Sequence, residues 1–327
     1  LDAAPVLIDL LAAAPDLKML VTSRIVLHLS GEHEYLVLPL KVPAPTYLPS
    51  LERLTQSEAV RLFAERARAV HPDFTLNEDN ALAVAEICTR LDGLPLAIEL
   101  AAARVRVLPP EKMATRLGKP LDFLKGGARD LPARQQTLRG AISWSYELLE
   151  EPAKQLLRRL SIFIGGACLT EVEAVCSGDL QSGMDILDAM AVLIDHSLVN
   201  QDLHGDEPRI TMLETIREFA YEQLVQSGEL EQIEARHTAA FQALTAAAEP
   251  NLIRKGRGRW LDRLEEDVDN LRAVLSRLID SGSIGPAQRM VGILWRFWQM
   301  RGYIREGRKR PAEVLSHPGG EPAQRVA

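Results

Sequence analysis

From residue 51 onward, apolar residues recur at helical spacing almost without interruption, and this pattern constrains the fold more than any other feature of the sequence. The first such segment carries Val60, Phe63, Ala64 and Ala67 on one face, the spacing of an amphipathic helix. We expect it to begin at a capping box, Thr55-x-x-Glu58. Further helical segments are predicted over 77–91, 96–107, 137–149, 152–163, 186–196, 214–225 and from 229 to the end.

The first 50 residues have a different character. Residues 5–14 predict an apolar helix, and the segments 18–24 and 35–40 predict two short buried strands, apolar at their centres. A helix joined to strands in this way indicates part of an α/β unit. Ligands of such sheets bind at the carboxyl ends of the strands, where Thr22, Ser23 and Arg24 fall.

The middle of the chain predicts a winged helix. Several helices are followed by two short strands, at about 197–201 and 209–212, around a polar turn through His204-Gly205-Asp206, and this predicts a hairpin. The helix that would enter a DNA groove, 186–196, has neighbouring or internal acidic residues and no Lys or Arg. Because affinity for phosphates comes from neutralising their charge, we expect this helix to be a poor reader of DNA.

Composition excludes several classes of protein. With 46% apolar residues the chain has enough material for a core, and no run approaches the roughly 18–20 apolar residues of a membrane span. The net charge of −7 argues against a protein coated by nucleic acid. Three cysteines without a Cys-x-x-Cys pair indicate a reduced, cytoplasmic protein. Since residue 1 is Leu and both ends look cut within folded units, we expect a fragment of a longer protein.

No motif of catalysis or metal binding occurs in the sequence. It lacks Gly-x-x-x-x-Gly-Lys-Ser/Thr, Gly-x-Ser-x-Gly and His-Glu-x-x-His, and its seven histidines are scattered. We therefore assign no catalytic and no metal-binding residue. Three segments stand out together: Met19 to Arg24, Gly93-Leu94-Pro95-Leu96-Ala97 and Met212 to Glu218. Singly, Arg24 reads as a solvated strand end and Gly93-x-Pro95 as a break between helices.

The order and spacing of these segments resemble the NB-ARC-type STAND signalling NTPases of the bacterial transcriptional-regulator branch. In that family the strand with "TSR" is a sensor strand, "GLPLA" lies in the helical domain after the NTPase core, and the winged helix ends in a Met-His-Asp-like motif. The segment from Arg134 to Leu149 is similar to the start of that winged helix, and Trp260 to Arg272 resembles the helical repeat that follows it. The resemblance covers nearly the whole chain.

The resemblance implies a nucleotide-binding set. Arg24, with Thr22 and Ser23, would face the γ-phosphate, and Gly93, Leu94 and Pro95 would line the adenine and ribose. Leu213 and Glu214 would occupy the Met-His-Asp position. Leu213 replaces the histidine that contacts the ADP β-phosphate, and leucine cannot donate that hydrogen bond. Glu214 remains as the acidic member, pairing within the winged helix.

The resemblance also implies the organisation of the chain. We expect the C-terminal part of an NTPase core over 1–50, a helical domain over 51–128, a winged helix over 129–228 and the start of TPR-like helical repeats over 229–327. The phosphate loop and Walker B aspartates would lie before Leu1, so we expect this chain alone not to hydrolyse ATP or to bind it tightly with Mg²⁺.

The resemblance implies a nucleotide-gated signalling regulator of transcription. In it, ADP locks the winged helix, and ATP plus an inducer releases it for self-association. The inducer, a ligand or a protein, would act on the helical repeats, and DNA would be bound by a domain outside this chain; no membrane partner is expected. Two alternatives stay open: a helical-repeat interaction scaffold without nucleotide, and a DNA-binding winged helix. A run of cations, Arg301 to Arg310, is either a solvated helix end or the partner surface.

Overall fold

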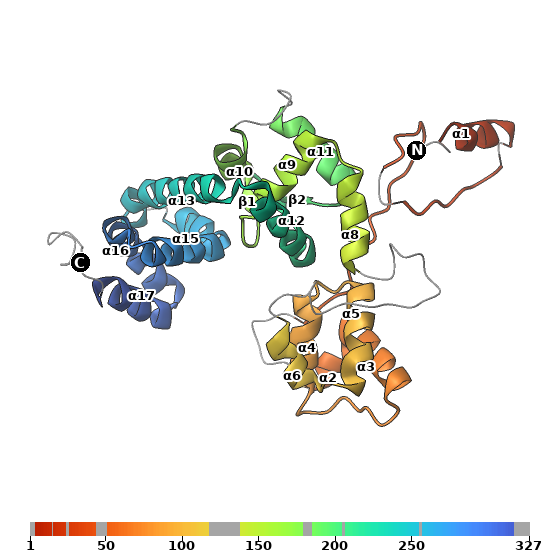
Figure 1. The fold of residues 1–327 in the computed structure, drawn as a ribbon, viewed down its shortest axis with the longest axis horizontal. Helices are drawn as coiled ribbons and strands as arrows, with labels where there is room; N and C mark the ends of the chain where they lie inside the picture. The colour runs from red at the N-terminus through yellow and green to blue at the C-terminus, as the bar shows by residue number, and fades with distance from the viewer. Residues whose placement is uncertain are drawn as a thin grey trace. The chain divides into compact units, whose positions relative to one another are not determined.

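A computed structural model describes residues 4–14, 16–23, 26–43, 51–117, 138–178, 185–204, 207–254 and 257–316 (Figure 1). The chain divides into two compact units. The first comprises Leu1–Lys154, Asp188–Val199 and Leu213–Ala220, and the second comprises Gln155–Leu187, Asn200–Met212 and Tyr221–Ala327. The fold is mainly helical, as predicted. The division into four domains is a different partition of the chain and stays a prediction.

The N-terminal segment holds a helix but no strands. Helix α1 (Ala4–Ala13) is close to the predicted 5–14, whereas residues 16–23 and 26–43 contain no strand in the described part of the chain. The prediction of strands over 18–24 and 35–40 is therefore wrong for the described residues. Strands need neighbours to satisfy their backbone N–H and C=O groups. The side chains of Leu20, Tyr35 and Val37, 96%, 89% and 82% exposed, are not buried either.

Residues 51–117 form a helical module around a common apolar core. Its elements are α2 (Leu51–Gln56), α3 (Glu58–Val70), α4 (Ala81–Arg90), α5 (Pro95–Ala102), the 3₁₀ helix η1 (Ala103–Arg106) and α6 (Pro110–Arg116). Figure 1 shows them gathered together, and α3 packs against α5 while α4 packs against α6. The fully buried side chains include Phe63, Ile87, Leu91, Ile98 and Met113. The predicted helical spacing thus marks the face that each helix buries.

The predicted capping box at the start of this module is wrong. Thr55 lies inside α2, where its hydroxyl donates to the carbonyl of Glu52, and the N-cap of α3 is Ser57. The Glu58 carboxylate instead accepts the backbone N–H of Lys41, while the Ser57 hydroxyl donates to the Lys41 carbonyl. Both side chains thereby fasten the segment that precedes residue 44 to the helical module.

The winged-helix elements follow in the predicted order. They are α8 (Leu138–Glu147), α9 (Glu151–Leu160), β1 (Ala167–Cys168), α10 (Leu169–Cys176), α11 (Ile186–Asp195), β2 (Asn200–His204), β3 (Glu207–Thr211) and α12 (Glu214–Ser227). The strands form an antiparallel sheet in the order β1-β3-β2, with Gln201 opposite Ile210 and Ala167 on the other side of Ile210. The predicted hairpin is confirmed, and a third short strand completes the sheet.

The C-terminal part of the chain is helical throughout its described residues. It consists of α13 (Leu230–Leu252), α14 (Gly258–Glu266), α15 (Val268–Asp280), α16 (Ile284–Arg301) and α17 (Ile304–Ser316). The segment from Trp260 to Arg272, which resembles a helical repeat, is divided between α14 and α15, because a break at Asp267 separates them. Gly302, at φ 79°, ends α16. The assignment of these helices to TPR-like repeats stays a prediction.

Candidate functional site

Asp92 and Gly93 form a tight turn between α4 and α5. Both are left-handed, at φ 53° and 66°, and the Gly93 N–H donates to the carbonyl of Cys88 at 3.1 Å, which caps α4. The Leu40 N–H donates to the Gly93 carbonyl at 3.0 Å, and a Cβ at Gly93 would collide with the Leu40 carbonyl oxygen. Only glycine fits here. The two hydrogen bonds of Gly93 hold the backbone that leads into Leu94 and Pro95.

Asp92 reaches from this turn to the first turn of α12. Its Oδ2 accepts the backbone N–H of Thr215 at 3.4 Å, where the helix N-terminus favours negative charge. Two of the three predicted site segments, Gly93–Pro95 and Leu213–Glu214, therefore lie at one place in the first unit. The sequence alone assigned Asp92 no part in the site. Asp before Gly is a common turn pair whose side chain accepts backbone N–H groups, but this local pattern does not indicate the distant N–H of Thr215.

The electrostatics of this place centre on Asp92. Burial raises the pKa of Asp92 to about 6, the Thr215 N–H opposes the rise, and the charge of Glu214 adds to it. Glu214 itself pairs with Arg217, which donates from Nε at 2.8 Å and from Nη2 at 2.6 Å. The side chain of Thr215 is fully buried, and its hydroxyl has no hydrogen-bond partner among the described residues. The site thus combines a carboxyl group of raised pKa, that of Asp92, with the Thr215 hydroxyl, which lacks a hydrogen-bond partner among the described residues.

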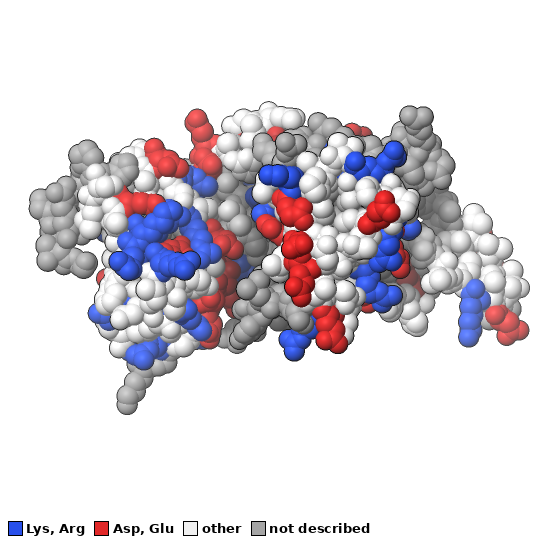
Figure 2. All heavy atoms as spheres, turned by 90° about the horizontal axis from the view of Figure 1, so that it is seen from below, with Lys and Arg blue, Asp and Glu red and all other residues white. Residues whose placement is uncertain are grey.

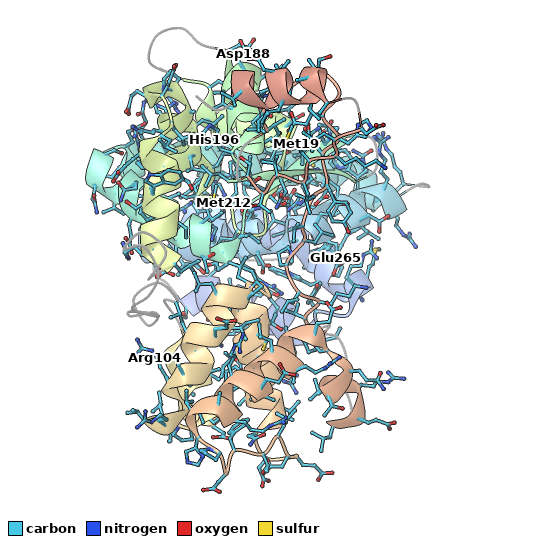
Figure 3. All side chains as sticks on the ribbon, turned by 90° about the vertical axis from the view of Figure 1, so that its right-hand side faces the viewer. Met19, Arg104, Asp188, His196, Met212 and Glu265 are labelled. Carbon is cyan, nitrogen blue, oxygen red and sulfur yellow. The ribbon has the colours of Figure 1, made fainter. Side chains whose placement is uncertain are left out.

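The third predicted segment, Thr22 to Arg24, lies only partly within the described residues. Thr22 and Ser23 are exposed in the irregular segment 16–23, from which Figure 3 labels Met19, and Arg24 lies outside the described residues. Their role toward a nucleotide stays a prediction.

The basic side chains of the winged-helix segment are engaged within the protein. Between residues 151 and 227 they are Lys154, Arg158, Arg159, Arg209 and Arg217. Every arginine of this set is in an ion pair, and the Lys154 ammonium lies 5.8 Å from the centre of the Tyr146 ring. Helix α11, which carries the labelled Asp188 in Figure 3, has no basic residue.

Two of these ion pairs are buried in the second unit. The Arg209 guanidinium on β3 donates to Asp267 Oδ1 at 3.1 Å and to the carbonyls of Gly165, Gly166 and Glu266, and the side chain of Asp267 is fully buried. Arg159 donates to Glu229 at 2.8 Å. Burial alone would raise the pKa of Glu229, but the hydrogen bonds from Arg159 and Arg158 hold it below its usual value. These arginines stabilise the fold and are not free to contact phosphates.

The cationic run of the last two helices is mostly paired. Figure 2 shows Lys and Arg side chains gathered over α16 and α17, with acidic side chains among them. Arg301 pairs with Asp262 and Glu265, and Lys309 and Arg310 both pair with Glu313. Within the described part of the chain, Arg305 and Arg308 are exposed and form no ion pair. These two positive charges of the run from Arg301 to Arg310 are therefore not neutralised by a described carboxylate.

The described residues contain neither a metal-binding cluster nor a membrane-spanning helix. No group of three or more His, Cys, Asp or Glu side chains is arranged to hold a metal ion in that part of the chain. Among the same residues, none of the helices has the length and apolar character needed to cross a bilayer.

Comparison with known proteins identifies the middle of the chain. A family described as "Winged helix-turn-helix domain" matches residues 149–225, in agreement with the order of α9 to α12. The chain is 41% identical over 308 residues to "Putative HTH-type transcriptional regulator Rv0890c" of Mycobacterium tuberculosis and to "Putative HTH-type transcriptional regulator Mb0914c" of Mycobacterium bovis. These matches cover 94% of this chain and 33% of each relative, so the chain spans about a third of their length.

A second, shorter relative matches less of the chain. "Uncharacterized protein Rv0894" of Mycobacterium tuberculosis is 37% identical over 239 residues, which is 72% of this chain and 58% of that protein. The chain therefore contains a winged helix-turn-helix domain and is homologous to these mycobacterial proteins.

Proposed function

We propose that this chain is the switch portion of a nucleotide-gated transcriptional regulator that works in the cytoplasm. In this proposal ADP holds the winged helix in a closed state, and ATP together with an inducer releases it for self-association. The relatives named as HTH-type transcriptional regulators support the regulatory role. DNA would be bound by a domain outside residues 1–327.

The observation that carries the proposal is the hydrogen bond from the Thr215 N–H to Asp92. It brings the backbone of Gly93, Leu94 and Pro95 to the start of the helix that carries Glu214. The buried, unpaired hydroxyl of Thr215 supports a polar ligand at this place, since a buried polar group without a partner is destabilising by roughly 1–3 kcal/mol. A rigid Gly–Leu–Pro backbone suits the flat face of a nucleoside.

The residues present fit the nucleoside better than the phosphates. Asp92 already accepts the N–H that a phosphate oxygen would use, and its negative charge opposes another anion there. Arg24 and residues outside this chain would have to hold the phosphates and Mg²⁺. A switch also needs different contacts with ADP and ATP, and Arg24, opposite the γ-phosphate, would supply that difference.

The test is nucleotide binding by the full-length protein, measured by calorimetry with ADP and with a non-hydrolysable ATP analogue. Arg24→Ala should weaken binding of the ATP analogue about ten- to hundredfold, the size of a lost hydrogen bond to a charged group, and leave ADP binding within about threefold. Pro95→Ala should weaken both nucleotides, and the exposed Arg68→Ala serves as the control. Equal loss of both nucleotides in Arg24→Ala would count against the gating role.

Two other functions are tested by separate experiments. If neither nucleotide binds to the full-length protein, the helical-repeat scaffold becomes the better account. DNA binding by the winged helix is the second candidate, because that domain class commonly reads DNA. Fluorescence anisotropy with duplex DNA tests it: since the arginines of this domain are engaged in ion pairs, we expect residues 1–327 to bind DNA only weakly, even at low salt.

A further inference from the structure

Helices α15 and α17 lie side by side and run in the same direction. Arg272 on α15 donates from Nη2 to Glu306 on α17 at 2.7 Å, and one turn later Arg310 on α17 donates to the Ser276 hydroxyl at 3.2 Å. Both contacts join residues that are 34 positions apart. Because the two separations are equal, the helices are parallel, and their carboxyl ends lie at the same end of the pair.

A cavity of about 330 Å³ lies between these two helices. Its size is at the lower end of the range for small-molecule sites, roughly 300–1,000 Å³. The lining is mainly polar, with one apolar side chain, and consists of Ser276, Ile279, Asp280, Arg310, Glu313 and Ser316.

The charges around the cavity favour a cation. Among the lining side chains the positive group is Arg310, which donates to Glu313 at 3.1 Å, and Lys309, outside the lining, also pairs with Glu313. Asp280 is exposed and forms no ion pair with any described residue, so it is the carboxylate of the lining that is left without a cationic partner. Asp280 is also the last residue of α15, and Ser316 is the last residue of α17. The carboxyl ends of two parallel helices add negative partial charge at the same place.

We propose that this cavity binds a small aliphatic amine, such as a diamine or an amino alcohol. Its ammonium group donates to the Asp280 carboxylate and to the hydroxyls of Ser276 and Ser316, and its carbon chain lies on Ile279. Carboxylates and phosphates are disfavoured by the negative charge of Asp280. The site gives a chemical class to the inducer proposed above, but amine binding requires no nucleotide, so either proposal can fail without the other.

The experiment is calorimetric titration of residues 1–327 with putrescine at physiological salt, and with 1,4-butanediol as the uncharged analogue of the same length. Putrescine should bind at one site and butanediol should not. Asp280→Asn should weaken putrescine about ten- to hundredfold, as expected for a lost hydrogen bond between charged groups, and Ser276→Ala should weaken it less. Asp280 is exposed, so its loss leaves the packing intact.

The matched control is Glu249→Gln, which removes one negative charge from an exposed position of α13 in the same unit. It should leave putrescine affinity unchanged. The proposal is overturned if putrescine gives no saturable heat up to 10 mM, about 100 times a 0.1 mM dissociation constant. It is also overturned if butanediol binds equally well, or if Glu249→Gln weakens putrescine binding as much as Asp280→Asn does. The last result would mean that amines only screen the net negative charge.

Discussion

Replacing Asp92 by Asn should stabilise the first unit at neutral pH. The pKa of Asp92 is raised from 3.8 to about 6 by burial and by Glu214, so the folded state holds this proton more tightly than the unfolded state. The stability gained from protonation is full below about pH 3.8 and is lost as the pH rises through about 6. At 1.36 kcal/mol per pKa unit, the difference amounts to at most about 3 kcal/mol. Asn removes the buried charge, keeps an oxygen for the Thr215 N–H and tolerates the left-handed turn.

The assay follows the first unit alone. Cys88 lies in its core, where burial raises the pKa of the thiol to about 12, so labelling of Cys88 reports opening of this unit. Thiol labelling in urea, located by mass spectrometry, should show Asp92→Asn to be more stable than the wild type by about 1–3 kcal/mol at pH 7.5, and by about 1 kcal/mol at pH 4.5. Asp73→Asn, an exposed position in the same unit, is the control. A loss of 1 kcal/mol or more at pH 7.5 would refute the reasoning, because it would show that the charge stabilises α12.

Three further predictions follow from the structure. Gly93→Ala should destabilise the first unit by more than about 2 kcal/mol, because the new Cβ would collide with Leu40. The control is Gly31→Ala, also at positive φ but with open space around it, which should cost only about 1 kcal/mol. Equal losses of stability in thermal denaturation would show that the collision does not matter. Arg209→Met should lower the unfolding free energy of the second unit by about 2–4 kcal/mol in urea titrations, because Asp267 stays buried with one partner fewer. A change under about 0.5 kcal/mol, the size of an ordinary surface substitution, would show that this ion pair does not stabilise the unit. Residues 1–327 should release no phosphate from ATP above background, and turnover abolished by a point mutation within the chain would contradict this.

Helical periodicity in the sequence predicted most of the fold because it records which side chains are buried. Val60, Phe63 and Ala67 were all placed on one helix face by spacing alone, and all are fully buried. The hairpin was also predictable, since a polar turn interrupts two short strands. The capping box failed because the sequence pattern cannot tell whether Thr55 begins one helix or lies inside another. The strands of the first 50 residues failed because a strand depends on neighbours that a local pattern does not contain.

The candidate site was predictable only in part. The resemblance selected Gly93 and Glu214, but the residue that joins their segments is Asp92, which contacts Thr215 across 123 positions of sequence. Nothing in the local sequence encodes such a distant contact. The ion pairs of the arginines could not be predicted from the sequence either. Arg209 and Arg159 look like ordinary cations of a strand and a helix, and only the structure shows that they pair with Asp267 and Glu229.

The last prediction joins the charge of Asp92 to the proposed binding of nucleotide. If an ADP phosphate approaches the start of α12 in the full-length protein, it must compete with the Asp92 carboxylate for the Thr215 N–H. Asp92→Asn removes one negative charge from that place, so ADP affinity should rise by about three- to tenfold at pH 7.5, the effect of a nearby like charge in a partly screened site. Since Asp92 gains a proton near pH 6, the wild type should approach the affinity of the variant as the pH falls from 7.5 to 5.5. Calorimetry at the two pH values measures both effects. If Asp92→Asn weakens ADP at pH 7.5, or if its advantage persists unchanged at pH 5.5, the phosphate does not lie at α12.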